Sequence, residues 1–173
     1  GRLRQQLAAS PFDVSAKREL ARLLLERKKY TEALRLLEEA KDFSESSAEF
    51  WDDLGAACLG LGRIEEGEAH ILHALSLNER VKYGQPYLRL ASAFRERDPQ
   101  KALQYAARFG EIQSSSSEAY YLLGCLYQSL GSKEEAKRAY TESIEVYRSL
   151  PKYKKRQERG WALRSYFKRS TMG

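Results

Sequence analysis

The chain has 173 residues, of which 42% are hydrophobic and 31% are charged, and it carries a formal net charge of +6. This balance is typical of a folded domain and excludes a chain that is disordered throughout. No apolar run approaches the roughly 20 residues that a membrane-spanning helix needs, and the first residues lack the apolar centre of a secretory signal. We therefore expect a protein that is soluble as given, although a leader or an anchor could have been removed.

The two cysteines, Cys58 and Cys125, lie far apart in the sequence and belong to no paired cysteine or histidine spacing. This arrangement indicates neither a disulfide framework nor a zinc cluster, so we interpret both as small residues of helix packing. Free cysteines slightly favour the cytoplasm. Two of them do not fix the compartment, which the sequence leaves unknown.

After a leading segment, residues 1–13, the chain repeats one pattern of small and large side chains four times. The repeated segments are 14–47, 48–81, 84–116 and 117–150. Aligning the second with the fourth places Gly55 on Gly124 and Cys58 on Tyr127. Self-similarity with a period near 34 residues is typical of stacked helix pairs, each of which is too small to bury its apolar face alone.

The third repeat departs from this spacing. It is one residue short between its two helices, and the additional residues Lys82 and Tyr83 precede it. We therefore expect a local irregularity in the stacking at this point of the chain.

Helix-start signals fall at the boundaries that the repeat requires. Three Ser-x-x-Glu stretches have the spacing of a capping box, and they begin at Ser46, Ser115 and Ser132. Asp98 followed by Pro99 is a further start signal, because aspartate caps a helix and proline fits its first position. The sequence therefore predicts paired helices separated by short turns.

Glycine and alanine recur at two kinds of place. Gly62 and Gly131 fall in the turns inside a repeat, where a positive backbone angle is readily adopted. Gly55, Gly124 and Ala21 fall where the first helix of a repeat meets the second. A larger side chain there would push the two backbones apart, so we predict a close approach between the helices.

This spacing of large aromatics, Leu-Gly or Leu-Ala pairs and later small residues over 14–150 resembles the tetratricopeptide repeat family. The residues that carry it in the best-aligned pair of repeats are Trp51, Leu54, Gly55, Tyr120, Leu123 and Gly124. The resemblance implies an all-α, right-handed superhelix of about four helix pairs with a C-terminal basic capping helix. Leu3, Leu7 and Pro11 fall where the family has its last helix and terminal proline. We therefore expect residues 1–13 to be the end of a preceding helix.

The resemblance also implies that the first helix of each repeat lines a concave groove, where partners of this family usually bind. Carried over repeat by repeat, the groove residues are Arg18, Arg22, Leu25, Asp52, Ala56, Leu59, Leu88, Ser92, Arg95, Tyr121, Cys125 and Gln128. The alternative is that some of them form only a solvated face, since exposed residues need no special explanation.

The side chains of this groove restrict its ligand. Its arginines suit carboxylates or phosphates, and its leucines and Tyr121 suit apolar side chains of a peptide. We therefore expect a protein or peptide partner that is acidic with apolar side chains. Some family members clamp the C-terminal carboxylate of heat-shock chaperones with lysine and asparagine. The corresponding places here hold Arg18, Arg22, Asp53, Gln85 and Arg89, so we do not predict that ligand.

The C-terminal segment, residues 151–173, holds the excess of positive charge. Its basic residues are Lys152, Lys154, Lys155, Arg156, Arg159, Arg164, Lys168 and Arg169. Glu158 is its single acid, so the segment carries a net charge of +7. One interpretation is a capping helix that covers the last repeat. The alternatives are a surface for nucleic acid or anionic membranes, and the start of further repeats that have been truncated.

Enzyme and metal-site patterns are missing from the sequence. Glu66, His70 and His73 share one helical face, but their spacing matches no known metal motif, and we predict no metal. The chain has no phosphate-binding glycine loop and no nucleophile next to a base. We therefore expect a non-catalytic adaptor or scaffold that uses no cofactor and no small-molecule substrate.

Overall fold

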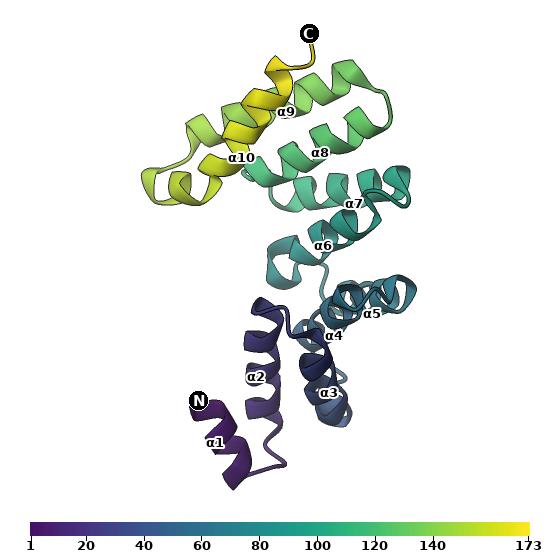
Figure 1. The fold of residues 1–173 in the computed structure, drawn as a ribbon, viewed down its shortest axis with the longest axis vertical. Coiled ribbons are helices and arrows are strands. Elements are labelled where there is room, and N and C mark those ends of the chain that lie inside the picture. The colour runs from purple at the N-terminus through teal and green to yellow at the C-terminus, as the bar shows by residue number, and fades with distance from the viewer. The chain divides into compact units, whose positions relative to one another are not determined.

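The computed structural model describes all residues from 1 to 173 and contains ten α-helices, two short 3₁₀ helices and no β-strand. The expected all-α fold class is confirmed. The chain divides into two compact units, unit 1 (Gly1–Lys82) and unit 2 (Tyr83–Gly173). Figure 1 shows the helices of each unit in chain order, from purple to yellow. None of them combines the length and the apolarity needed to cross a membrane.

Unit 1 is built from two helical hairpins and a leading helix. Its elements are α1 (Arg2–Ala9), α2 (Val14–Glu26), α3 (Tyr30–Ala40), the 3₁₀ helix η1 (Lys41–Phe43), α4 (Ala48–Gly60) and α5 (Ile64–Leu77). Helix α2 packs on α3 and α4 packs on α5, while α3 joins the two hairpins by its contact with α4. Leucines and alanines of α2 and α3 form one apolar core with Phe50 and Trp51 of α4. A second 3₁₀ helix, η2 (Val81–Gly84), follows α5.

Unit 2 has the same hairpin design with one further helix. Its helices are α6 (Gln85–Phe94), α7 (Pro99–Ile112), α8 (Ser117–Ser129), α9 (Lys133–Ser149) and α10 (Lys152–Ser170). Helix α6 packs on α7, α7 on α8, and α8 on α9. Helix α10, drawn in yellow in Figure 1, lies against both α9 and α8. The expected C-terminal basic helix is therefore present, and it packs on the last hairpin.

Three fully buried serines join α8, α9 and α10 where these helices meet. The Ser117 hydroxyl donates to the Ser143 carbonyl oxygen at 2.9 Å, and the Ser143 hydroxyl donates to the Ser117 carbonyl oxygen at 2.8 Å. The Ser165 hydroxyl of α10 donates to the Ser143 hydroxyl oxygen at 2.7 Å. These bonds satisfy buried polar groups and need small side chains, so α10 approaches α9 closely.

The helix starts agree with the sequence signals to within one residue. Asp98 caps α7, as predicted, by accepting from the backbone N–H of Lys101. The first two predicted caps are wrong by one residue. Ser47 caps α4 where Ser46 was predicted, and Ser116 caps α8 where Ser115 was predicted. Ser132 precedes α9 but makes no side-chain capping bond. Within a run of serines, the backbone conformation decides which hydroxyl reaches the first free N–H.

The predicted close approach of the paired helices is confirmed in both units. A Cβ atom added to Gly55 would lie 2.9 Å from the carbonyl oxygen of Gly67, and one added to Gly124 would lie 2.5 Å from Cε1 of Tyr140. Neither place has room for a methyl group. The turn glycine Gly62 also has the expected left-handed backbone, with a φ of 79°. Small residues therefore set the separation of the helices within each hairpin.

Candidate functional site

The predicted groove residues of unit 1 lie on α2 and α4, which touch each other. We call this surface the α2–α4 face, and its members are Arg18, Arg22, Leu25, Asp52, Ala56 and Leu59. Arg22 is exposed, whereas Leu25, Ala56 and Leu59 are half-buried. Leu20, Ala21 and Leu24 of α2 are buried in the core. Of the six predicted groove residues only Arg22 is exposed, whereas Asp52 is fully buried and Leu25 packs against the core.

Arg18 takes part in holding the two hairpins together. Its Nη2 donates to the Ser47 hydroxyl oxygen at 2.8 Å, and this same oxygen accepts from the backbone N–H of Phe50. The guanidinium carbon of Arg18 also lies 5.9 Å from the centre of the Phe50 ring. The half-buried Arg18 therefore supports the start of α4, and less of its binding capacity is left for a partner.

A cluster of charges occupies the centre of unit 1. Asp52 and Asp53 are buried, and the Lys82 ammonium lies 2.8 Å from Oδ2 of Asp52 and 2.5 Å from Oδ1 of Asp53. Arg22 Nε is 4.0 Å from Oδ2 of Asp53, and the Arg22 side chain keeps 51% of its surface exposed. Two adjacent buried carboxylates are costly without a cation, and Lys82 supplies one.

The two extra residues before the third repeat make this arrangement possible. Lys82 and Tyr83 both have positive φ angles, 49° and 57°, which residues other than glycine adopt rarely. The backbone therefore turns sharply at the place where the sequence predicts an irregular stacking, and the stacking itself stays a prediction. The Lys82 side chain starts from this turn and reaches back to α4.

The predicted groove residues of unit 2 come from α6 and α8. Leu88 and Ser92 belong to α6, where Leu88 is buried and Ser92 is exposed, and the half-buried Arg95 directly follows this helix. Three belong to α8, namely Tyr121, Cys125 and Gln128. All three of the α8 residues have partners within unit 2.

Helix α10 and the residues after it cover part of α8. The Trp161 ring lies 5.5 Å from the Tyr121 ring, centre to centre. Met172 packs in an apolar cluster with Cys125 and Tyr140. The Tyr140 hydroxyl also donates to Oε1 of Gln128 at 2.8 Å. The predicted groove positions of α8 are therefore partly occupied by the protein's own side chains, although Gln128 stays exposed.

The acid of the C-terminal segment faces α8. Burial raises the pKa of the Glu158 carboxyl, although the N–H groups of Glu118 and Ser117 at the start of α8 act against this rise. Burial also raises the pKa of the Glu118 carboxyl, and the neighbouring Glu158 charge adds to this rise. Both carboxyls therefore hold a proton more readily in the folded unit than in an unfolded chain.

The bases of α10 lie mostly on its outer surface. Those that are exposed are Lys152, Lys154, Arg156, Arg159 and Arg164, whereas Lys155, Lys168 and Arg169 are half-buried. Arg169 donates to the Thr141 hydroxyl oxygen at 3.2 Å, and its guanidinium lies over the Tyr166 ring. Tyr153 and Phe167 are also exposed on this helix, so its outer surface combines positive charge with aromatic rings.

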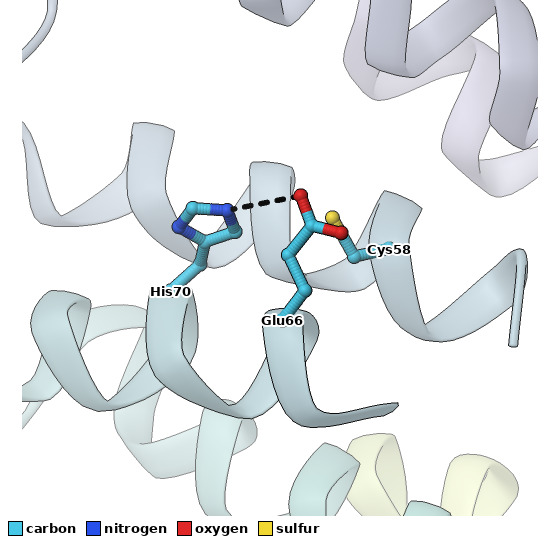
Figure 2. A group of neighbouring side chains, drawn as sticks. All are labelled: Cys58, Glu66 and His70. Carbon is cyan, nitrogen blue, oxygen red and sulfur yellow. Dashed lines mark ion pairs between the residues drawn. The ribbon is translucent and has the colours of Figure 1, made fainter. Parts of the chain in front are cut away.

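Both histidines of α5 pack against Trp51. The His73 ring lies edge-on with ring centres 4.5 Å apart, and the tilted His70 ring lies at 5.5 Å and is also next to Glu66. Figure 2 shows that Cys58 of α4 joins Glu66 and His70. The sequence shows which residues share one face of α5, but it does not show that the Cys58 thiol of the neighbouring helix lies beside them. Sequence reasoning therefore missed this thiol.

Two family models match parts of the chain, both described as tetratricopeptide repeat, at residues 14–47 and 117–150. A comparison with curated protein sequences gives no significant match. Among solved structures, the chain is similar to MamA, with 21% identity, coverage of 83% of this chain and 84% of MamA, and a TM-score of 0.74.

Two further structures share this fold. The thermophilic TPR protein TTC0263 of Thermus thermophilus has 19% identity and a TM-score of 0.72, with coverage of 95% of this chain and 87% of that protein. The first TPR of Spaghetti (RPAP3), bound to the HSP90 peptide SRMEEVD, has 21% identity and a TM-score of 0.62. That match covers 69% of this chain and 94% of the other. At such identities the likeness establishes the fold alone.

Proposed function

Because this chain belongs to the tetratricopeptide repeat family, we propose that it is a non-catalytic adaptor that binds a peptide or another protein. The similar Spaghetti domain binds a peptide, which supports this class of partner. The observation that carries the proposal is the exposed Arg22 side chain on the α2–α4 face, next to the partly exposed Leu25, Ala56 and Leu59. On α8, by contrast, α10 covers part of the predicted groove surface.

The α2–α4 face offers one exposed cation beside apolar surface. Lys82 supplies one positive charge to the two carboxylates of Asp52 and Asp53, and Arg22 adds a second from 4.0 Å while 51% of its side chain stays exposed to a partner. Leu25 and Leu59 are half-buried and provide apolar contact. A carboxylate on a partner would bind Arg22 by paired N–H bonds, and neighbouring apolar side chains would pack on the leucines. An acidic peptide with apolar residues fits this chemistry.

The chaperone carboxylate clamp is not part of this proposal. Of the places that the family uses for the clamp, Arg18 supports the start of α4 and Asp53 binds Lys82. Neither is available to an anionic chain end. The ligand that we propose is therefore an internal or terminal peptide segment held by Arg22 and apolar contacts.

A pull-down with the intact chain tests the location of binding. The Arg22→Glu variant reverses the exposed charge of the α2–α4 face, and the Arg35→Glu variant makes the same change on an exposed arginine of α3. We expect a partner that the unmodified chain and Arg35→Glu retain and that Arg22→Glu loses. Equal retention by both variants would exclude this face as the binding surface.

A second candidate function is binding of nucleic acid or an anionic membrane surface through α10. It is favoured by exposed bases and exposed rings on the same helix, among them Lys154, Arg156, Tyr153 and Phe167. Bases neutralise phosphates, and aromatic rings stack on nucleobases or enter a lipid interface.

Salt dependence distinguishes this second function from binding at the α2–α4 face. We would titrate a fluorescent single-stranded oligonucleotide and, separately, phosphatidylserine vesicles across a range of ionic strength. If α10 binds phosphates, changing Lys152, Lys154 and Arg156 together to glutamine lowers the salt slope by about one for each lost contact. Binding that the triple variant leaves unchanged would rule α10 out.

A further inference from the structure

Three side chains with metal-binding chemistry converge between α4 and α5 (Figure 2). They are the Cys58 thiol of α4 and the Glu66 carboxylate and His70 imidazole of α5. One ligand atom from each lies within 4.8 Å of the others, and His70 Nε2 is 4.0 Å from Oε1 of Glu66. The cluster belongs entirely to unit 1 and lies outside the set of residues proposed for partner binding.

The repeat pattern explains why there is space for this cluster. Cys58 takes the place that Tyr127 has in the fourth repeat, so a small thiol stands where a phenol ring stands elsewhere. Glu66 and His70 are four residues apart, which puts them on one face of α5, above the thiol. The substitution of a cysteine for a large aromatic therefore allows these two side chains to approach α4.

Thiolate, imidazole and carboxylate are the three kinds of side chain that bind zinc in proteins. Zinc bonds of roughly 2.0–2.3 Å in a tetrahedron place the ligand atoms about 3.5 Å apart. The three atoms are therefore within small side-chain rotations of that geometry. We propose that Cys58, Glu66 and His70 form a binding site for a zinc-type divalent cation, with water as the fourth ligand.

The burial of the three groups fits a three-ligand site with one open position. Cys58 is fully buried, 22% of the His70 side chain is exposed, and 49% of the Glu66 side chain is exposed. The thiol thus lies at the base of the site and the carboxylate at its entrance. Because Glu66 is the most exposed of the three groups, we place the water ligand on its side.

The kinds of ligand favour a cation that bonds to sulfur and nitrogen. A thiol binds such a cation as the thiolate and an imidazole binds it through a ring nitrogen. Binding therefore displaces the Cys58 thiol proton to solvent, which zinc does and magnesium does not.

The surrounding charges limit the affinity. Arg63 Nη1 lies 4.0 Å from Oε2 of Glu66, and the Lys41 charge acts on His70. The Glu38 charge acts on Cys58 and His70 with the opposite sign and offsets part of this repulsion. A bound cation would join α4 to α5 and stabilise the hairpin of the second repeat.

Cobalt titration of the full chain tests the site directly. The chain would be reduced, stripped of metal and free of any histidine tag. We expect Co²⁺ to give a thiolate-to-metal absorption band and the intense visible bands of four-coordinate cobalt, saturating at a single equivalent. Zn²⁺ should abolish both sets of bands, and added Zn²⁺ should raise Tm.

Matched variants identify the ligands. Cys58→Ser should abolish the thiolate band, whereas Cys125→Ser, which changes the other cysteine, should keep it. His70→Gln should weaken binding by at least about 10-fold, the loss expected even for an outer-shell partner, whereas His73→Gln should leave it unchanged. Circular dichroism confirms that each variant is helical. Absence of the thiolate band in the unmodified chain, or its persistence in Cys58→Ser, would overturn the proposal, as would equal losses in His70→Gln and His73→Gln.

Discussion

Replacing Lys82 with methionine is expected to destabilise unit 1, because it removes the ammonium group that lies between two buried carboxylates. Asp52 and Asp53 have almost no exposed surface, and both lie within hydrogen-bonding distance of Lys82 Nζ. Methionine keeps most of the length of the side chain and loses only the charge and its hydrogen bonds. The change therefore isolates the ion pairs from the packing of the stem.

The size of the effect follows from the burial of the partners. Removing one partner of a fully buried ion pair costs about 3–5 kcal/mol. The Lys82 side chain keeps 27% of its surface exposed, so water reaches the cluster and we expect a loss of about 2–3 kcal/mol. For a chain of this size, such a loss lowers Tm by roughly 5–10 °C.

Thermal unfolding followed by circular dichroism at neutral pH measures this loss. Lys28→Met is the matched control, because Lys28 is an exposed lysine with a similar left-handed backbone, φ 59°. Asp53→Asn in the Lys82→Met background should recover part of the stability, since it removes one uncompensated charge. If Lys82→Met and Lys28→Met lower Tm by the same small amount, the charge cluster does not stabilise the fold.

Further substitutions test other contacts. Gly55→Ala should cost about 1–3 kcal/mol in urea unfolding because the new methyl meets packed atoms, whereas Gly110→Ala, in open space on α7, should gain about 0.5–1 kcal/mol. Ser47→Ala removes the cap of α4 and a bond from α2, and should cost about 1–2 kcal/mol by the same measurement. The raised pKa values of Glu118 and Glu158 mean that these groups favour folding below the usual glutamate pKa and lose that contribution as the pH rises through the raised values. Glu118→Gln should therefore raise Tm at pH 7 and change it little at pH 4, and a pH-independent effect would contradict this assignment.

The small-residue positions were predictable from the sequence because repetition reveals them. A glycine at the same place in two aligned repeats, Gly55 and Gly124, has no local conformational reason in the middle of a helix. Close helix packing was the remaining physical explanation, and the structure confirms it. The turn glycines Gly62 and Gly131 were predictable for a simpler reason, since each needs a positive φ angle.

The contacts that depend on tertiary geometry were not predictable in this way. The repeat spacing identified Lys82 as an extra residue. The direction of its side chain, however, follows from a backbone turn that no local sequence signal predicts. A C-terminal helix covering the last repeat was one interpretation of the sequence, but the position of Trp161 over Tyr121 depends on how α10 crosses α8. Cys58 is similar, because its neighbours come from a different helix.

The packing of Trp161 and Met172 over α8 has a thermodynamic consequence for any ligand of that helix. Such a ligand competes with a tethered segment whose effective concentration is of millimolar order. Its apparent dissociation constant equals the intrinsic one divided by the fraction of molecules in which α10 has swung away. A substitution that weakens the α10 contacts would therefore tighten binding to α8 without touching the ligand.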